Sequence, residues 1–96
     1  MRKLNRVKVI FSSTLTGVTN GERQVEVLAS TLGEALEKLT QRYGRKFKER
    51  MLDPTGKPKR LLNVYVNGKN VLFLELLDTP LKDGDEITIL PSVSGG

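Results

Sequence analysis

One helical repeat lies between short alternating runs, and this order constrains the fold more than any other feature. Thr31 followed by Glu34 is a capping-box signature, and Gly44 is a typical stop signal. The pattern predicts a helix over residues 31–43, and "RKFKERML" predicts a short second helical segment. Apolar residues recur through the main helix at helical spacing, at Leu32, Ala35, Leu36, Leu39 and Tyr43.

Alternating apolar runs on both sides of the helix predict β-strands. "VKVIF" and "RQVEVLA" precede it, separated by a connection that contains the turn signal "TNGE". After it, "LLNVYV" leads into Asn67-Gly68, a strong hairpin signal, and a last run contains Ile87 and Ile89. The predicted order is strand, strand, helix, strand, short strand, strand.

This order favours one α+β domain, because 96 residues are too few for two. We expect a mixed four- to five-stranded sheet packed on one main helix. For the first and last strands to share the buried centre of the sheet, we expect them to lie side by side. That arrangement is a β-grasp, with the domain over 1–91 and its final strand in the centre.

The composition excludes several classes of function. With no Cys, there is no disulfide framework and no thiol nucleophile. With no His, the commonest general base and metal ligand is missing. No apolar run approaches the roughly 20 residues that cross a membrane. The start, "MRKLNRVKVIF", lacks the apolar core of a secretory signal, so we expect a cytoplasmic protein.

Positive charge is concentrated in residues 42–60, where eight Lys and Arg residues face only Glu49 and Asp53. A basic segment can bind nucleic acid. The aromatic residues in this one, Tyr43 and Phe47, have the spacing of core residues, so a solvated helix face and a charged loop are the preferred interpretation. The acidic run "DGDE" near the last strand is interpreted as a turn, not as a metal site.

The chain continues past its last strand as "PSVSGG". Pro91 cannot donate a ladder hydrogen bond, so residues 92–96 are predicted to form a flexible tail. The six residues from Pro91 can reach roughly 20 Å when extended. Gly95 and Gly96 lack a Cβ atom and fit a narrow channel, with the α-carboxylate of Gly96 at its end.

"VNGKNV" followed by "TPLKDGDEITILPSVSGG" resembles the ubiquitin-like sulfur carriers, above all the small subunit of molybdopterin synthase. Two features depart from that family. Pro91-Ser92 stands where the family often has two prolines, and the basic stretch through "KPKR" is long. The resemblance implies a ubiquitin-like β-grasp fold and a protein that is not itself an enzyme.

The resemblance also implies a chemistry. A ubiquitin-activating-type partner would adenylate Gly96 with ATP and Mg²⁺, and a sulfur donor would convert it to a thiocarboxylate. The tail, with Pro91, Val93 and Gly95, would enter the large synthase subunit and give its sulfur to a molybdopterin precursor. No catalytic residue, metal or cofactor is expected in this chain, and neither a membrane nor a nucleic acid is an expected partner.

Three alternatives share some of these features. Gly96 could form an isopeptide bond, which would make the chain a protein modifier. The sulfur could serve tRNA thiolation, thiamine or an amino-acid pathway. The chain could also be a β-grasp interaction domain that has no use for its tail, with residues 42–60 as a surface for nucleic acid.

Alternation also predicts a docking face. If the inward side chains of the strands cover the helix, then Ile10, Tyr65 and Leu90 lie on the opposite face, just before the tail. An apolar cluster there favours partner docking. The alternative is that a loop covers these three residues. The inward set is Val7, Val9, Phe11, Leu62, Val64, Val66, Ile87 and Ile89.

Overall fold

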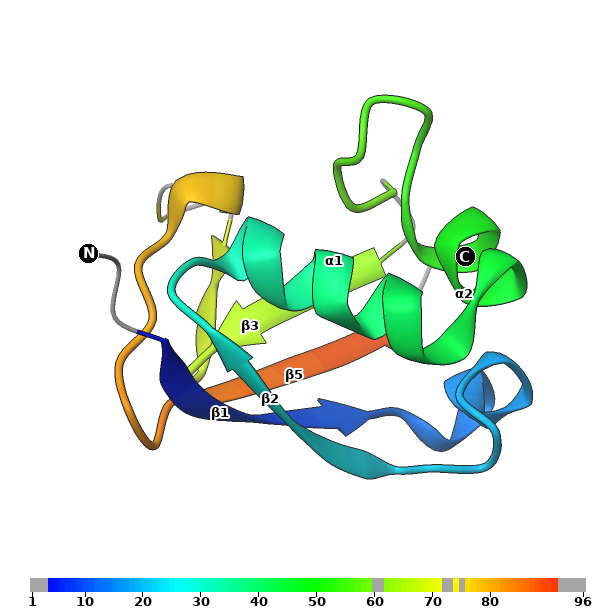
Figure 1. The fold of residues 1–96 in the computed structure, drawn as a ribbon. Coiled ribbons are helices and arrows are strands. Elements are labelled where there is room, and N and C mark those ends of the chain that lie inside the picture. Colours follow the sequence, from blue (N-terminus) through cyan, green and yellow to red (C-terminus); the bar gives the residue numbers. More distant parts are fainter. Residues whose placement is uncertain (1–3, 60–61, 72–73, 75, 92–96) are drawn as a thin grey trace.

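A computed structural model describes residues 4–59, 62–71, 74 and 76–91. Within these residues, one mixed sheet carries the helices on one face (Figure 1). The helices are α1 (Leu32–Tyr43) and α2 (Arg45–Met51), with 3-10 turns η1 (Ser13–Val18) and η3 (Leu76–Asp78). The strands are β1 (Asn5–Phe11), β2 (Gln24–Ala29), β3 (Leu62–Val66), β4 (Lys69–Asn70) and β5 (Glu86–Pro91).

The strand order is β2-β1-β5-β3-β4, so the last strand lies in the centre of the sheet. β5 runs parallel to β1, with Phe11 opposite Ile89, and antiparallel to β3, with Leu62 opposite Pro91. The predicted pairing of the first and last strands is therefore confirmed. The strand extends one residue further than its apolar pattern, through Pro91.

The core lies between α1 and the inward face of the sheet. Leu36 is 3% exposed and Leu39 is fully buried, which confirms the predicted phase of the helix. Burial of these side chains supplies the main stabilising free energy of a small domain. All the predicted inward strand residues are also buried, namely Val7, Val9, Phe11, Leu62, Val64, Val66, Ile87 and Ile89.

The ends of α1 follow its sequence signals. The Thr31 side chain accepts a hydrogen bond from the Glu34 backbone N–H at 3.2 Å. The Glu34 carboxylate reaches back to the Ser30 N–H, at 2.6 Å, one residue before the cap. Gly44 ends the helix with φ 91°, a left-handed region that favours glycine, and α2 starts at the next residue.

The 3-10 turns are the elements that the sequence does not predict. η1 lies in the first strand connection and buries Leu15, so this connection is part of the core. η3 packs against the start of α1, where Gly33 gives it room. A Cβ atom at Gly33 would lie 3.1 Å from the Leu77 carbonyl oxygen.

Candidate functional site at the end of the central strand

The predicted tail follows Pro91, the last residue that the structure describes. Pro91 is half-buried and lies opposite Leu62. Val93, Gly95 and Gly96 lie outside the described residues, so their predicted roles stay predictions. The proposed division into a domain over 1–91 and a tail over 92–96 also stays a prediction.

The strand that leads to the tail is held on both sides. Ile87 and Ile89 are buried in the core cluster, and the Ser12 backbone N–H donates to the Ile89 carbonyl oxygen at 3.0 Å. On the other side β3 pairs with β5 as far as Pro91. The residue from which the tail departs is thus fixed by ladder pairing and by core packing.

The acidic run before β5 is a hydrogen-bonded turn. Asp83 accepts from the Arg6 N–H at 2.7 Å, and Asp85 accepts from the Lys82 N–H at 2.7 Å. Asp85 also accepts from the Asn67 side-chain amide, whose oxygen in turn accepts the Glu86 N–H. Asp83 thus ties the turn to β1, and Asp85 ties it to Asn67 in the β3–β4 turn, which confirms the turn interpretation.

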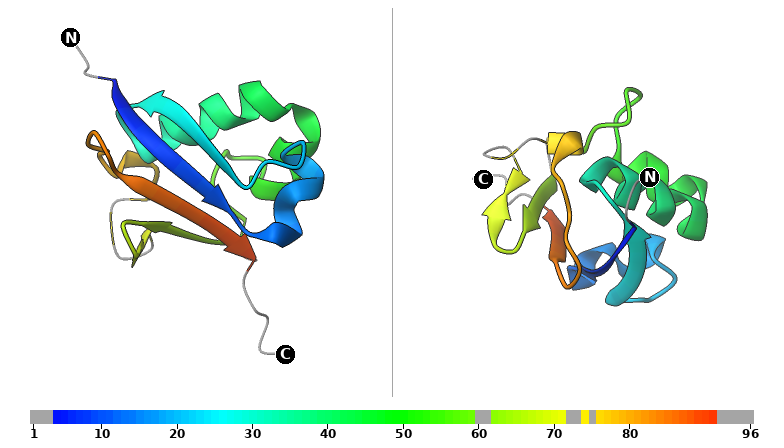
Figure 2. Two further views of the ribbon diagram at one scale, coloured as in Figure 1. Left: turned by 90° about the horizontal axis from the view of Figure 1, so that it is seen from below. Right: turned by 60° about the vertical axis from the view of Figure 1, so that its left-hand side comes forward.

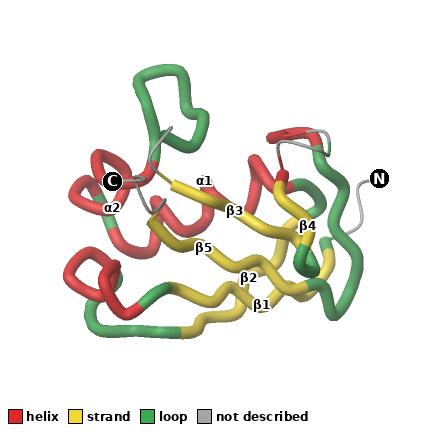
Figure 3. The backbone as a smooth tube through the Cα atoms, turned by 180° about the vertical axis from the view of Figure 1, so that it is seen from behind, coloured by secondary structure: helices red, strands yellow, loops and turns green. Residues whose placement is uncertain are grey.

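The sheet face opposite α1 brings the predicted docking residues together. Figure 3 views the molecule from behind, with the strands in front of the helices. Ile10 and Tyr65 flank Thr88 from either side, and Leu90 is two residues further along β5. All three predicted residues are half-buried.

The sequence prediction missed an apolar residue on the same face. Leu28 of the edge strand β2 is 48% exposed and lies opposite Arg6. The alternation of "QVEVLA" carried the signal, because it places Leu28 with Gln24 and Glu26 on the outward side.

The basic segment forms a solvated surface at the end of the molecule where β5 ends. Figure 2 shows the arrow of β5 ending beside η1 and α2. Phe47 is buried, and Tyr43 packs edge-on against Phe11 with ring centroids 5.8 Å apart. The core-like spacing predicted for both aromatic residues is confirmed.

Two carboxylates near this surface are held in their charged form. Hydrogen bonds from Arg42, at 3.0 and 3.2 Å, lower the pKa of Glu22. The Thr55 hydroxyl, which donates at 2.6 Å, lowers the pKa of Asp53. Both groups are therefore ionised at neutral pH and already engaged within the chain.

The sheet is mixed, it carries one main helix on one face, and its last strand is central and leads into the C-terminal segment. This arrangement defines a ubiquitin-like β-grasp protein. The sequence pattern of the ThiS family matches residues 9–96. The chain therefore belongs to the ThiS family, and the resemblance found in the sequence is confirmed.

Among its relatives, "Sulfur carrier protein CysO" of Mycobacterium tuberculosis is 39% identical over 92 residues, covering 94% of this chain and 98% of that protein. The crystal structure of the Amycolatopsis orientalis BexX/CysO complex contains a chain with TM-score 0.83 and 38% identity, covering 94% of this chain and 99% of that one.

Two further solved structures resemble the fold. Small archaeal modifier protein 1 of Methanosarcina acetivorans has TM-score 0.80 at 32% identity, over 97% of this chain and 98% of that one. A putative molybdopterin converting factor subunit 1 of Pyrococcus furiosus has TM-score 0.73 at 26% identity, over 93% of this chain and 99% of that one. These names describe a sulfur carrier, a modifier protein and subunit 1 of a converting factor, and the chain belongs with these small ubiquitin-like proteins rather than with catalytic enzymes.

No helix in the described part of the chain combines the length and the apolar character needed to cross a bilayer.

Proposed function

We propose that this chain carries sulfur on the α-carboxyl group of Gly96, as a thiocarboxylate that a partner enzyme forms. One observation carries the proposal: the ThiS-family match continues through Gly96, at the end of the segment that follows central strand β5. The sulfur-carrier name of the Mycobacterium tuberculosis relative supports it.

The reaction needs activation, because a carboxylate is anionic and has no good leaving group. In the partner, a carboxylate oxygen of Gly96 attacks the α-phosphorus of ATP, and pyrophosphate leaves as its Mg²⁺ complex. A sulfide donor then attacks the acyl carbon of the acyl-adenylate. AMP leaves with the electrons of the broken C–O bond, and the thiocarboxylate remains. ATP and Mg²⁺ belong to the partner in this scheme.

The fold contributes a fixed point of departure. Pro91 is paired with Leu62, so a partner that binds the sheet receives the following residues in a defined direction. Val93 would provide a side-chain contact within the tail. Gly95 and Gly96, which have no Cβ atom, would pass the narrowest part of a channel.

The docking face in this proposal is the cluster of Ile10, Tyr65 and Leu90. It surrounds Thr88 on the outward side of the sheet and ends one residue before Pro91. Because the cluster comes from three neighbouring strands, a partner that covers it also lies beside the start of the tail. The adenylating enzyme and the protein that receives the sulfur would both use this face, one after the other.

The acceptor proposed from the sequence is a molybdopterin precursor, delivered through a molybdopterin synthase large subunit. The name of the Pyrococcus furiosus structure supports this acceptor at 26% identity. Relatives at 38% and 39% identity are instead named CysO, and these names do not mention molybdopterin. An amino-acid acceptor, which the chemistry of the tail leaves open, is the competing proposal.

A second candidate function is protein modification through the same activated Gly96. The Methanosarcina acetivorans structure, named a small archaeal modifier protein at 32% identity, favours it. Attack by a lysine amine on the acyl-adenylate would give an isopeptide bond in place of a thiocarboxylate. Covalent adducts with other proteins in cell extracts would identify this function.

The proposed function is tested by reconstitution with the adenylating enzyme of the same organism, ATP, Mg²⁺ and sulfide. Mass spectrometry of the intact protein should show the exchange of one oxygen for one sulfur. A variant without Gly95-Gly96, and one extended by a residue after Gly96, should remain unmodified. Gly17→Ala is the matched control, because Gly17 has open space around it and no left-handed φ. Modification of the shortened variant would contradict the proposal.

A further inference from the structure

The cations of the basic segment form a surface to which the proposed function gives no role. We name it the basic collar. It lies on α2 and on the loop that follows α2. Among the described residues its members make one side-chain ion pair, between Arg45 and Glu49, and Lys57 also interacts with Asp53. Its residues are Arg45, Lys46, Lys48, Arg50, Lys57 and Lys59, all exposed.

A chain of backbone contacts places this collar at the end of the sheet from which the tail departs. Leu62 lies opposite Pro91, and its N–H donates to the Lys59 carbonyl oxygen at 3.0 Å. The Lys59 N–H donates to the Met51 carbonyl oxygen, at the end of α2, at 2.9 Å. Lys59 is therefore fixed between α2 and the strand that borders the tail.

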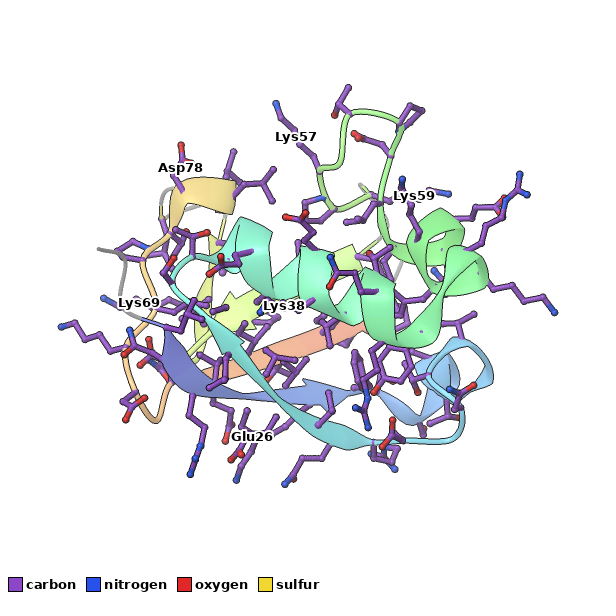
Figure 4. The ribbon with its side chains drawn as sticks, viewed as in Figure 1. Glu26, Lys38, Lys57, Lys59, Lys69 and Asp78 are labelled. Carbon is purple, nitrogen blue, oxygen red and sulfur yellow. The ribbon has the colours of Figure 1, made fainter. Side chains whose placement is uncertain are left out.

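The middle of α2 is anchored to the same end. Phe47 packs edge-on against Phe11, with ring centroids 6.1 Å apart, and Phe11 lies opposite Ile89, two residues before Pro91. α2 and the loop enclose a shallow groove of about 650 Å³, in which Lys48 and Lys59 both take part. Figure 4 shows Lys57 and Lys59 on this side of the molecule and Lys69 on the other.

The collar's charge is available to a partner. Its region contains two carboxylates. Glu49 makes a 3.5 Å ion pair with Arg45 on the exposed helix surface, and Asp53 accepts hydrogen bonds from Thr55 and from the Lys57 N–H. Exposed cations in such an excess attract an opposite charge over about a Debye length, which is roughly 10 Å at 0.1 M salt.

We propose that the basic collar docks on an acidic protein surface that borders the site receiving residues 92–96. Whatever accepts those residues must approach the end of β5, where it meets the collar as well as the docking face. Carboxylates at that entrance would speed encounter and orient the tail. The inference rests on the proposed function, because it assumes that a protein receives the tail.

Two other occupants fit the observations less well. Single-stranded nucleic acid is bound by aromatic stacking beside cations. In this segment Phe47 is buried, and Tyr43 is half-buried and packed against the core. A second copy would have to offer its acidic turn. In that turn, Asp83 and Asp85 already accept hydrogen bonds from within the chain.

The test compares two double variants of the full chain in binding to the adenylating enzyme of the same organism. Lys48→Gln with Lys59→Gln removes two charges from the collar groove. Lys69→Gln with Lys82→Gln removes two exposed charges at the other end of the sheet. At about 50 mM salt the collar variant should associate about fivefold more slowly than the wild type, and at about 500 mM salt the difference should vanish. The control variant should match the wild type at both salt concentrations.

Several outcomes overturn the proposal. They are equal rates for the collar variant and the wild type, equal losses in both variants, or no binding of the wild type to the enzyme. Loss of binding to a single-stranded oligonucleotide with unchanged enzyme binding would assign the collar to nucleic acid. The collar variant could also associate more slowly with an enzyme that binds the chain but forms no thiocarboxylate on it. That result would support the proposed role of the collar and would contradict only the proposed function.

Discussion

Leu36 shows at the scale of a residue how the helix is tied to the sheet. It lies on the buried face of α1, is 3% exposed, and belongs to the same core cluster as Val9 and Ile89. Its neighbour Glu37 is exposed on the opposite side of the helix. Substituting Ala at each of the two positions therefore distinguishes the contribution of core packing to stability from that of helix propensity.

Replacing Leu36 with Ala should lower the free energy of unfolding by about 2–5 kcal/mol, because the substitution leaves a cavity in a close-packed core. That is a large part of the roughly 5–15 kcal/mol that stabilises a domain. Urea unfolding measures the change, and Glu37→Ala is the control. An unchanged unfolding midpoint for Leu36→Ala would mean that the phase of the helix is wrong.

A second prediction at this scale concerns Arg42. It joins α1 to Glu22, in the turn before β2, and lowers the pKa of that carboxyl group. A carboxyl with a lowered pKa in the folded state stabilises the protein above its unfolded pKa. This contribution is lost as the pH falls through the folded value. In Arg42→Gln the pKa of Glu22 should rise toward its ordinary value.

NMR titration of the Glu22 carboxyl measures this shift. The difference in melting temperature between wild type and Arg42→Gln should shrink as the pH falls from neutral through the lowered pKa. Arg50→Gln, which removes an exposed cation without a carboxylate partner among the described residues, is the control. The same pKa of Glu22 in wild type and Arg42→Gln would refute the assignment.

At the scale of the element, β5 has two faces with different roles. Ile87 and Ile89 point into the core, whereas Thr88 and Leu90 lie half-buried on the outward side. Leu90→Asp should therefore leave the fold intact and weaken binding of the adenylating enzyme at least about tenfold, or roughly 1.4 kcal/mol. Leu28→Asp, on the same face but on the edge strand, is the matched control.

Calorimetric titration of the enzyme with each variant provides the measurement, after circular dichroism has established that the variant is folded. If Leu90→Asp unfolds, Leu90→Asn and Tyr65→Ser test the same face with milder changes. Normal affinity in a folded Leu90 or Tyr65 variant would place the interface elsewhere.

The elements that could be predicted from sequence are those with local signals. Thr31, Gly44 and Asn67-Gly68 define ends and turns through their own backbone and side-chain chemistry. That β1 and β5 lie side by side was also predicted, because both were expected to share the buried centre of the sheet, and the structure shows that they run parallel. η1 and η3 carry no comparable pattern. They depend on tertiary packing, such as burial of Leu15 and the close approach of Leu77 to Gly33.

The candidate site could be predicted only in part, for a similar reason. Gly96 and the outward cluster follow from a motif and from alternation. The position of the collar does not, because it depends on Phe47 anchoring α2 to Phe11 and on Lys59 bonding to Met51. A charge count along the sequence finds the cations but not the end of the sheet where they gather.

At the scale of the whole molecule, the described core is complete before the tail. The last buried core residue is Ile89, and the last ladder partner is Pro91. A chain shortened to residues 1–91 should therefore melt within about 2 °C of the full chain, since it keeps the whole of the described core and the described ladder pairing. Differential scanning calorimetry provides the comparison. A drop of more than about 5 °C would mean that residues 92–96 contribute to the fold and would contradict the proposed division.

The central claim is that sulfur is carried on the last residue and not elsewhere in the chain. Tandem mass spectrometry of the C-terminal peptide, taken from protein purified after activation by its enzyme, tests this claim most directly. We expect the fragment containing Gly96 to carry sulfur in place of one oxygen, while fragments that end at Gly95 or earlier keep their unmodified mass. Sulfur on any other residue, or an unmodified Gly96 in protein that donates sulfur, would contradict it.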